Sequence, residues 1–507
     1  MPSHPTVRPP LGLDEVPGWD FDLEVIVVGF GAAGASAAIE ATGVGARVGI
    51  FEAASASGGT SALSGGYIYF GGSGGTPAQR DNGFPDTTED FFRYMMMAGG
   101  PDADEARVRL YAENALDHYG WLETQGVRFR NTYVPGKRET PQTGDCLLWS
   151  GNEDAWPFNQ HARPCPRGHL PEAPGKLGGK HLLDVLADRV TKLGVSIRMD
   201  ARVTALVTDP AGRVHGVVVQ NAGEQRFARA RRGVILCAGG FVLNQEMLHR
   251  HVPTAARLAA DALSAGHDDG SGIALGSSVG AATLHMDELF TTLPIYPPES
   301  HIKGILVNER GERFVNEDAY PGRVSVHCLR QAGDRLFLLV DDAIFERPSA
   351  LSRIEVAAVE GSWPDLERSL GMPDGALART VERYNRDAAR GEDPLFHKSS
   401  KWLRPLDEPP FAALACHVGE AFYPFFTLGG LHTLPSGEVL DTHDEVVAGL
   451  FAAGRTCCGL PRSAEGYSSG LSLADCTFFG RLAGRSAAES SGTEPTSQGL
   501  ASERSPA

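Results

Sequence analysis

A glycine-rich turn that directly follows a run of apolar residues constrains the fold of this chain more than any other feature. The run at residues 23–28 (LEVIVV) is continuous and rich in β-branched side chains, as in a strand buried on both faces. Gly29, Gly31 and Gly34 follow it as G-x-G-x-x-G, and the small residues 32–41 continue as a tightly packed helix. Such glycines allow a tight turn, the approach of a pyrophosphate and close packing of helix on strand. The pattern predicts a βαβ unit that binds a dinucleotide.

An acidic residue and a second loop favour FAD over NAD as this dinucleotide. Residues 47–51 form a second apolar strand, which ends at Glu52, where an acid binds the ribose hydroxyls. A loop rich in glycine and hydroxyl groups comes soon afterwards, at residues 57–66. A cofactor larger than NAD, such as FAD, would need a second loop of this kind to bind its other half. Its predicted contacts are Gly59, Thr60, Ser61, Ser64, Gly65 and Gly66.

Two segments near the C-terminus extend the predicted cofactor site. Gly454 and Arg455 follow a short apolar strand at residues 449–453, and residues 468–475 (SSGLSLAD) open another helix. The N-terminus of that helix would present free N–H groups to the isoalloxazine or the pyrophosphate. A capped packing helix would explain this segment on its own, but the N-terminal elements favour a cofactor contact.

Composition limits the partners that the chain can bind. The formal net charge of −17 argues against nucleic acids and anionic membranes, which bind basic surfaces. The eight cysteines include no C-x-x-C pair, so neither a metal site nor a disulfide framework is predicted. The first 20 residues lack the apolar centre of a signal peptide, and the most apolar stretch, residues 25–41, contains glycines and a glutamate. We therefore expect no membrane span and a cytoplasmic location.

The pattern of elements predicts an interrupted domain. Residues 21–281 and 411–487 carry the cofactor motifs and apolar strands, while extended segments at 304–308 and 336–341 mix with a helical segment at 376–390. We predict that residues 282–410 form an inserted second domain. Residues 1–20 have no periodic pattern and are expected to be a flexible arm. Residues 488–507 have the composition of a disordered tail.

Several motifs, in the same order, resemble the fumarate reductase / 3-ketosteroid dehydrogenase flavoprotein superfamily. They are GFGAAG (29–34), FEA (51–53), GGTSALSGG (58–66), ILCAGGF (235–241), GLFAAGR (449–455) and SSGLSLADCTFFGRLAG (468–484). The resemblance implies an α/β fold in which a Rossmann-like FAD-binding domain is interrupted by an α+β substrate-capping catalytic domain. It implies non-covalent FAD, because residues 53–66 lack the histidine that carries covalent flavin in succinate dehydrogenases. It also implies cofactor contacts at Ala33, Ala53, Val203, Ala238, Gly239, Ser472 and Leu473.

Two positions within the resemblance argue against a small dicarboxylate as substrate. Fumarate reductases carry an arginine proton donor just after an R-F-x-N-E element, and that position falls on Pro321 here. Their carboxylate-binding arginine aligns with Tyr467. A dicarboxylate would lose its charge-assisted partners at both places. Arg323, close by in the sequence, could still substitute for one of them.

Tyr320, Tyr467 and Ser469, in N-E-D-x-Y and G-Y-x-S-G, closely resemble the catalytic residues of Δ4-3-ketosteroid 5α-dehydrogenases. This resemblance implies a small hydrophobic 3-ketosteroid as substrate, in steroid catabolism. A proton would leave carbon 4 and a hydride would pass from carbon 5 to flavin N5, which makes the C4–C5 double bond. Tyr467 and Ser469 are candidates for proton abstraction, and Tyr320 for a relay or for polarising the ketone. N–H groups near Gly470 would complete an oxyanion hole. The sequence leaves the division of these roles open.

Three alternatives remain at this stage. The first is a Δ1-3-ketosteroid dehydrogenase, although its Y-P-G-P-G element reads YSSGL at residues 467–471 here. The second is a fumarate-reductase-like enone or enoate reductase, which would need an electron donor. The third is a redox-sensing flavoprotein without catalytic activity. No sequence feature identifies the electron acceptor.

Overall fold

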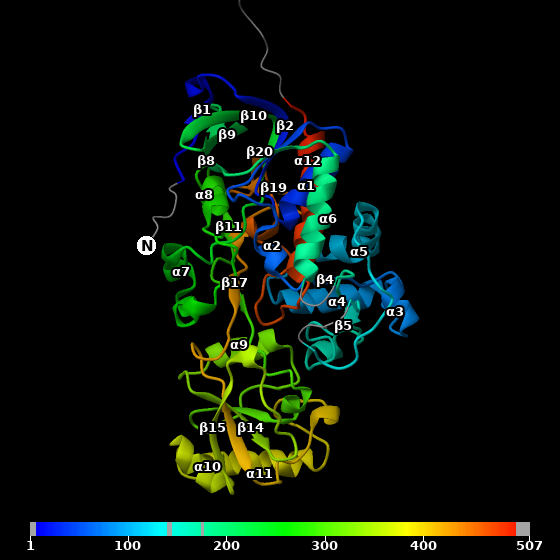
Figure 1. The fold of residues 1–507 in the computed structure, drawn as a ribbon, viewed down its shortest axis with the longest axis vertical. Helices are drawn as coiled ribbons and strands as arrows, with labels where there is room; N and C mark the ends of the chain where they lie inside the picture. The colour runs from blue at the N-terminus through cyan, green and yellow to red at the C-terminus, as the bar shows by residue number, and fades with distance from the viewer. Residues whose placement is uncertain (1–6, 139–143, 174–176, 493–507) are drawn as a thin grey trace, which may run out of the picture.

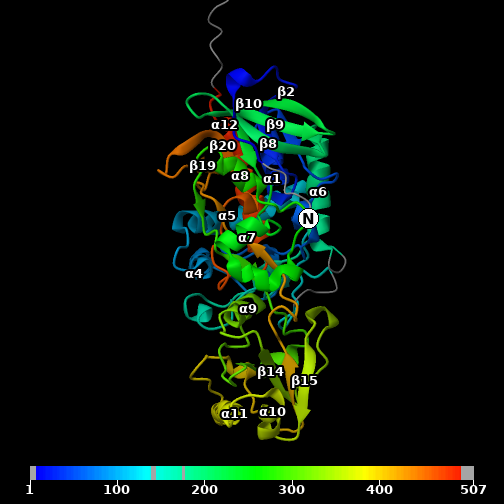
Figure 2. The ribbon, with the colours of Figure 1, turned by 90° about the vertical axis from the view of Figure 1, so that its left-hand side faces the viewer.

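The computed structural model describes residues 7–138, 144–173 and 177–492, and they form two lobes along the long axis of the molecule (Figure 1). One lobe holds the large sheet with three helices beside it, α1 (Ala32–Gly43), α6 (Gly178–Lys192) and α12 (Leu471–Glu489). The other holds a small sheet with α10 (Trp363–Leu370) and α11 (Ala376–Ala388) at its end. Helix α9 lies between the lobes in both views (Figure 2). Within the described ranges, no helix combines the length and the apolar character needed to cross a bilayer.

The large sheet is parallel at its centre and antiparallel at one end. The strand that joins both parts is β10, whose first half pairs with an antiparallel neighbour and whose second half pairs with two parallel ones. The central strands, in spatial order, are β7 (Ser196–Arg198), β3 (Val48–Phe51), β2 (Phe21–Val28), β10 (Glu224–Leu236) and β20 (Val446–Ala452). The antiparallel part consists of β9 (Val214–Asn221) and β8 (Ala201–Thr208), with β1 (Leu11–Gly12) added in parallel at the edge of β8. Strand β19 (Glu438–Leu440) pairs antiparallel with β20.

The described part of the N-terminal segment does not form the expected flexible arm. Strand β1 pairs in parallel with β8, with Leu11 opposite Val207. Leu13, Val16 and Trp19 pack against a small buried cluster on the sheet. Burial of these apolar side chains offsets the entropy cost of ordering the segment. The segment has no periodic pattern, so the sequence did not indicate this burial. At the other end, α12 (Leu471–Glu489) runs two residues into the predicted tail, and residues 493–507 of that tail lie outside the described residues.

Helix α1 (Ala32–Gly43) packs closely and in parallel against α12. A Cβ atom added at Gly480 would lie 2.6 Å from the carbonyl oxygen of Ala33. One added at Gly484 would lie 2.2 Å from the carbonyl oxygen of Ala37. Because Ala33 at the start of α1 lies opposite the middle of α12, the N-terminus of α12 extends past the glycine turn. Small residues on both helices therefore allow the N-termini of α1 and α12 to lie in the same region of the molecule.

Gly484→Val is expected to lower the free energy of unfolding by about 3 kcal/mol, because the added atoms would overpack this contact. The measurement is urea denaturation of the FAD-loaded protein. Gly120→Ala in α5 (Glu105–Gln125) is the control, since a Cβ atom there would meet no atom within 4 Å. That change is expected to leave stability equal or to raise it by up to about 1 kcal/mol. Equal stability of both variants would contradict the close packing of α1 on α12.

The small sheet of the second lobe is antiparallel throughout. Its order is β13 (Ile305–Asn308), β14 (Leu336–Asp341), β16 (Phe411–Ala415) and β15 (Glu355–Glu360), and its helices are α10 (Trp363–Leu370) and α11 (Ala376–Ala388). Strands β13 and β14 and helix α11 agree with the segments predicted from the sequence. Strand β16 pairs between β14 and β15, so this sheet extends past the predicted boundary at residue 410. Its apolar sequence resembles that of the strands of the first lobe.

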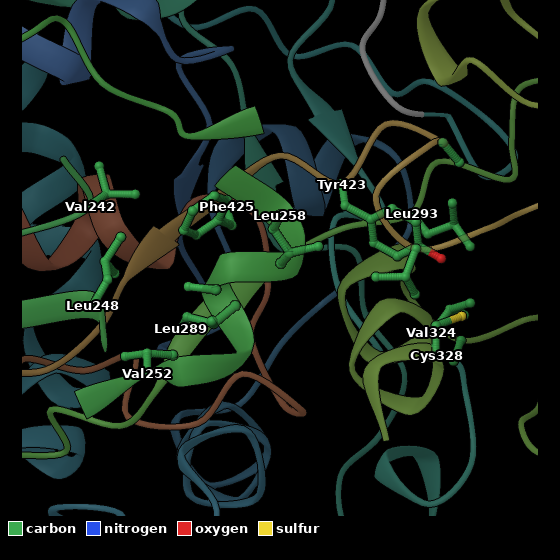
Figure 3. Packing of buried hydrophobic residues seen from close by; sticks show 14 of the residues in the cluster. Val242, Leu248, Val252, Leu258, Leu289, Leu293, Val324, Cys328, Tyr423 and Phe425 are labelled. Carbon is green, nitrogen blue, oxygen red and sulfur yellow. The ribbon is translucent and has the colours of Figure 1, made fainter. Parts of the chain in front are cut away.

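One continuous core joins the two lobes. It contains Leu248 and Val252 near α7 (Gln245–His251), Phe425 from β17 (Phe425–Thr427), and Val324 and Cys328 on α9 (Pro321–Leu329). Figure 3 shows these side chains along the path from α7 to α9. Strand β12 (Leu289–Thr291) pairs with β17 along the same path. Helix α9, and the residue that precedes it, are therefore held in a fixed position relative to the large sheet.

Candidate active site

A cavity of about 460 Å³ lies at the carboxyl ends of β2, β3 and β10. Parallel strands of α/β folds bind ligands at this edge. The cavity brings together most of the predicted cofactor residues: Gly29, Gly31, Ala33, Glu52, Ala53, Gly59, Thr60, Ser61, Val203, Ala238, Gly239, Gly454 and Arg455. Five other predicted residues, Ser64, Gly65, Gly66, Ser472 and Leu473, line a neighbouring cavity instead.

The carboxylate of Glu52 is fixed at the end of β3 by two backbone groups. The N–H of Phe30 donates to Oε2 at 2.6 Å, and the N–H of Ala54 donates to Oε1 at 2.7 Å. The glycine turn and the acid are thereby tied together, although 22 residues separate Phe30 from Glu52. The carboxylate keeps acceptor capacity for hydroxyl groups of a ligand, since each oxygen has a further lone pair.

Two glycines of the turn serve different purposes. A Cβ atom at Gly34 would lie 2.0 Å from the carbonyl oxygen of Gly29, so the protein itself requires glycine there. At Gly31 the nearest atom to an added Cβ would be Ser61 Oγ, at 3.6 Å, and its φ of −85° suits any residue. The protein alone would therefore accept a side chain at Gly31. The open space in front of its backbone fits a pyrophosphate that approaches the start of α1.

Asp268 is a residue of the cofactor cavity that sequence reasoning missed. Its Oδ2 accepts from the hydroxyls of Thr60 and of Ser264 (2.6 Å), and its Oδ1 accepts from the Gly240 N–H at 3.1 Å and from Arg455 at 2.7 Å. These partners lie far apart in the sequence, so no local pattern predicts the contacts. The one available signal is the acidic, glycine-containing turn HDDGSG (267–272) ahead of α8 (Ser271–Ser277).

Arg455 stands in the wall between the two cavities. Its guanidinium lies over the Phe426 ring, 5.0 Å from the centroid, and it also pairs with Asp268. Its Nη1 is buried and has no hydrogen-bond partner among the described residues. A buried donor of this kind is costly unless a ligand accepts from it. The flavin, which both cavities would have to share, is a suitable acceptor.

The second cavity adjoins the first and has mainly apolar walls. Its volume is about 340 Å³, and the two cavities share Thr60, Ser61, Leu63, Arg455 and Cys476. Aromatic side chains and prolines supply much of the lining: Tyr67, Trp149, Phe290, Tyr296, Phe422, Phe426, Pro294, Pro321 and Pro424. A flat apolar ligand in this cavity would lie next to the cofactor.

Tyr320 and Ser469 meet in this cavity, from opposite sides. Tyr320 immediately precedes α9 and Ser469 lies just before α12, and their hydroxyl oxygens are 2.6 Å apart. Residues 150–152 hold both backbones. The N–H of Ser469 donates to the Ser150 carbonyl (2.8 Å), the Ser150 hydroxyl donates back to the Ser469 carbonyl (2.9 Å), and the N–H of Tyr320 donates to Asn152 Oδ1 (2.9 Å). Nothing in the local sequence WSGN signals this role.

Tyr467 lies in the wall of the same cavity. Its ring packs against Phe290, with centroids 4.0 Å apart, and its hydroxyl donates to Ser472 Oγ at 3.0 Å. Burial raises the pKa of the Tyr467 phenol to about 12, although the bond to Ser472 and the charge of Arg455 act in the opposite direction. The phenol is therefore neutral at physiological pH and can donate a hydrogen bond.

Gly470 forms the start of α12 in a conformation that favours glycine. Its φ is +108°, and an added Cβ atom would lie 2.9 Å from the backbone nitrogen of Tyr69. Gly470, Ser472 and Leu473 all line the cavity, so the first turn of α12 faces it. The free N–H groups of that turn are suited to a developing negative charge.

Arg323 does not substitute for the missing cationic groups. Its Nη1 pairs with Glu465 Oε1 at 2.7 Å, and Arg323 lines neither of these two cavities. Of the described residues that line the second cavity, the charged ones are Arg138 and Arg455. Across the described ranges, no group of His, Cys, Asp and Glu side chains could hold a metal ion.

Comparison with known proteins agrees with this site. The FAD binding domain family model matches residues 24–471. The 3-oxo-5-alpha-steroid 4-dehydrogenase of Comamonas testosteroni is 30% identical over 87% of this chain and 94% of its own length. A fumarate reductase (cytochrome) of Shewanella frigidimarina is 27% identical over 92% of this chain and 77% of its own length.

A solved structure is also similar over nearly the whole chain. The crystal structure of 3-ketosteroid-Δ4-(5α)-dehydrogenase from Rhodococcus jostii, in complex with 4-androstene-3,17-dione, has a TM-score of 0.89 and 40% sequence identity. The match covers 95% of this chain and all of the other. Together with the family match and the cavity at the glycine turn, it identifies both the fold and the cofactor. This chain is an FAD-dependent oxidoreductase that belongs to the FAD binding domain family, within the fumarate reductase flavoprotein superfamily.

Proposed function

We propose that the protein introduces the C4–C5 double bond into a 5α-3-ketosteroid. The observation that carries this proposal is the bonded pair Tyr320–Ser469, together with Tyr467, in an apolar cavity that adjoins the FAD cavity. Neutral hydroxyl groups suit a ketone, whereas a small dicarboxylate would need two unpaired guanidinium groups, and the guanidinium of Arg455 already pairs with Asp268. The similar Rhodococcus jostii dehydrogenase, whose structure contains a 3-ketosteroid, supports the same substrate class.

The residues divide the work as follows in our proposal. Bound FAD supplies the acceptor for the hydrogen that leaves carbon 5 as hydride. Tyr320 first releases its hydroxyl proton to solvent. Ser469 Oγ then takes the proton from carbon 4 and gives its own proton to Tyr320 Oη across the 2.6 Å bond, which leaves both groups neutral. Tyr467 turns its hydroxyl proton from Ser472 Oγ to the ketone oxygen as negative charge develops there, and the N–H groups in the first turn of α12 beyond Gly470 add to this stabilisation.

The mode of cofactor attachment belongs to the same proposal. Residues 53–66 border both cavities and contain no histidine. This supports non-covalent FAD. Release of intact FAD on denaturation, with no flavin left on the chain, is the expected result.

Anaerobic addition of 5α-androstane-3,17-dione is expected to bleach the visible flavin absorbance and to give the Δ4-enone. The two electrons of the hydride would remain on the cofactor when no acceptor is present. A spectrophotometer follows the bleaching, and mass spectrometry with chromatographic standards identifies the product. A Δ1 product would change the regiochemistry, and no bleaching by any 3-ketosteroid would refute the steroid assignment. Fumarate serves as the control and is expected not to reoxidise the reduced flavin.

A further inference from the structure

The charged groups at the substrate cavity are unexpected for this chain. It has 63 acidic and 46 basic residues, yet among the residues that the structure describes, the charged side chains that line the cavity are Arg138 and Arg455, both cationic. Arg455 pairs with Asp268 at 2.7 Å, so its charge is compensated. Within the described part of the chain, the uncompensated charge in the cavity is therefore that of Arg138.

Arg138 differs from the lysine beside it. Lys137 is buried, pairs with Asp154 at 2.8 Å and donates to the Asp318 carbonyl. Its backbone N–H donates to Glu299 at 2.7 Å, which fixes the main chain next to Arg138. Arg138 itself is exposed at the cavity, and no hydrogen bond or ion pair links its guanidinium to another residue of the described ranges.

We propose that Arg138 binds a carboxylate on the side chain of the steroid, so that the preferred substrates are 3-ketosteroids with an acidic side chain. The inference rests on the proposed function of the same cavity. A guanidinium offers two parallel N–H donors that match a carboxylate. The exposed leucines of the cavity, Leu63 (67% exposed) and Leu263 (37% exposed), provide apolar surface for the hydrocarbon part of such a side chain.

The test compares two substrates that differ only in charge. They are 3-oxo-5α-cholan-24-oate and its carboxamide, with 5α-androstane-3,17-dione as the reference. In the FAD-loaded protein, kcat/KM for the carboxylate is expected to exceed that for the amide by about tenfold, since a hydrogen bond to a charged group is stronger than one to a neutral group. This ratio is expected to shrink as ionic strength rises.

Substitution of Arg138 then separates recognition from structure. Arg138→Gln is expected to bring the ratio close to one, and Arg138→Lys is expected to give an intermediate ratio. Arg130→Gln is the matched control, because Arg130 is a half-exposed arginine nearby in the sequence that pairs with Glu172 outside the cavity, and it should keep the full ratio.

Each outcome has a distinct meaning. If the enzyme oxidises the androstanedione but does not favour the carboxylate over the amide, the inference about Arg138 is wrong and the proposed function stands. If Arg138→Gln lowers kcat/KM equally for carboxylate and amide, Arg138 has a structural role and the inference is also wrong. If no 3-ketosteroid is oxidised, the proposed function itself fails.

Discussion

Tyr467→Phe is expected to lower kcat for oxidation of a 5α-3-ketosteroid by about 10²- to 10³-fold, the range measured when one oxyanion donor is removed. The phenylalanine ring would keep its contact with Phe290, so the cavity would keep its shape, while the hydroxyl that now donates to Ser472 would be gone. FAD is expected to remain bound. Single-turnover bleaching of the flavin measures the effect without interference from reoxidation.

The pH dependence separates two roles for Tyr467. The pKa of this phenol is raised to about 12, mainly by burial. As a donor, Tyr467 needs its neutral form, which persists up to that pKa, so its titration costs no activity below about pH 12. As the base, it would need the phenolate, and the rate would climb about tenfold per pH unit throughout that range. A climb of this kind that disappears in Tyr467→Phe would contradict the donor role.

Tyr296→Phe is the matched control for this experiment. Tyr296 is buried in the wall of the same cavity but is not among the proposed catalytic residues. Its replacement is expected to change kcat by less than about threefold. An equal loss in both variants would show that general packing of the cavity, and not the Tyr467 hydroxyl, controls the rate.

The parts of the fold that could be predicted from the sequence are those specified by short segments. The strand, the glycine turn, the helix and Glu52 lie within about 30 residues, and each follows from local sterics and hydrogen bonding. Strands β13 and β14 were predicted for the same reason, from their apolar runs. The FAD prediction needed only a second loop close to the first.

The parts that could not be predicted depend on contacts between distant segments. Asp268 joins Thr60 to Arg455, and Ser150 fixes Ser469 across more than 300 residues. Arg323 lies near Tyr320 in the sequence, but its side chain pairs with Glu465 and does not line the substrate cavity. The sequence does not reveal this pairing. Polar side chains such as these have no periodic pattern, so only tertiary structure selects their partners.

Gly31→Ala is expected to weaken FAD binding by about 10²-fold or more while leaving the apoprotein as stable as the parent. The added Cβ would meet no protein atom closer than 3.6 Å, and the backbone there has an ordinary φ. It would, however, occupy the space through which the pyrophosphate must approach the start of α1. Loss of one or two hydrogen bonds to a charged group is enough for this effect. Titration of apoprotein with FAD, followed by flavin fluorescence, gives the dissociation constant.

Two further glycines make this prediction decisive. Gly34→Ala would place a Cβ 2.0 Å from a carbonyl oxygen and is expected to destabilise the apoprotein itself. Gly361→Ala, in the second lobe, would meet no atom within 4 Å and should change neither stability nor FAD affinity. A stable Gly31→Ala protein with unchanged FAD affinity would mean that the pyrophosphate does not approach the backbone at this turn. If the Gly31→Ala apoprotein were instead as unstable as Gly34→Ala, glycine at position 31 would be required by the fold and not by FAD. A loss of stability measured without FAD cannot come from a lost contact with FAD.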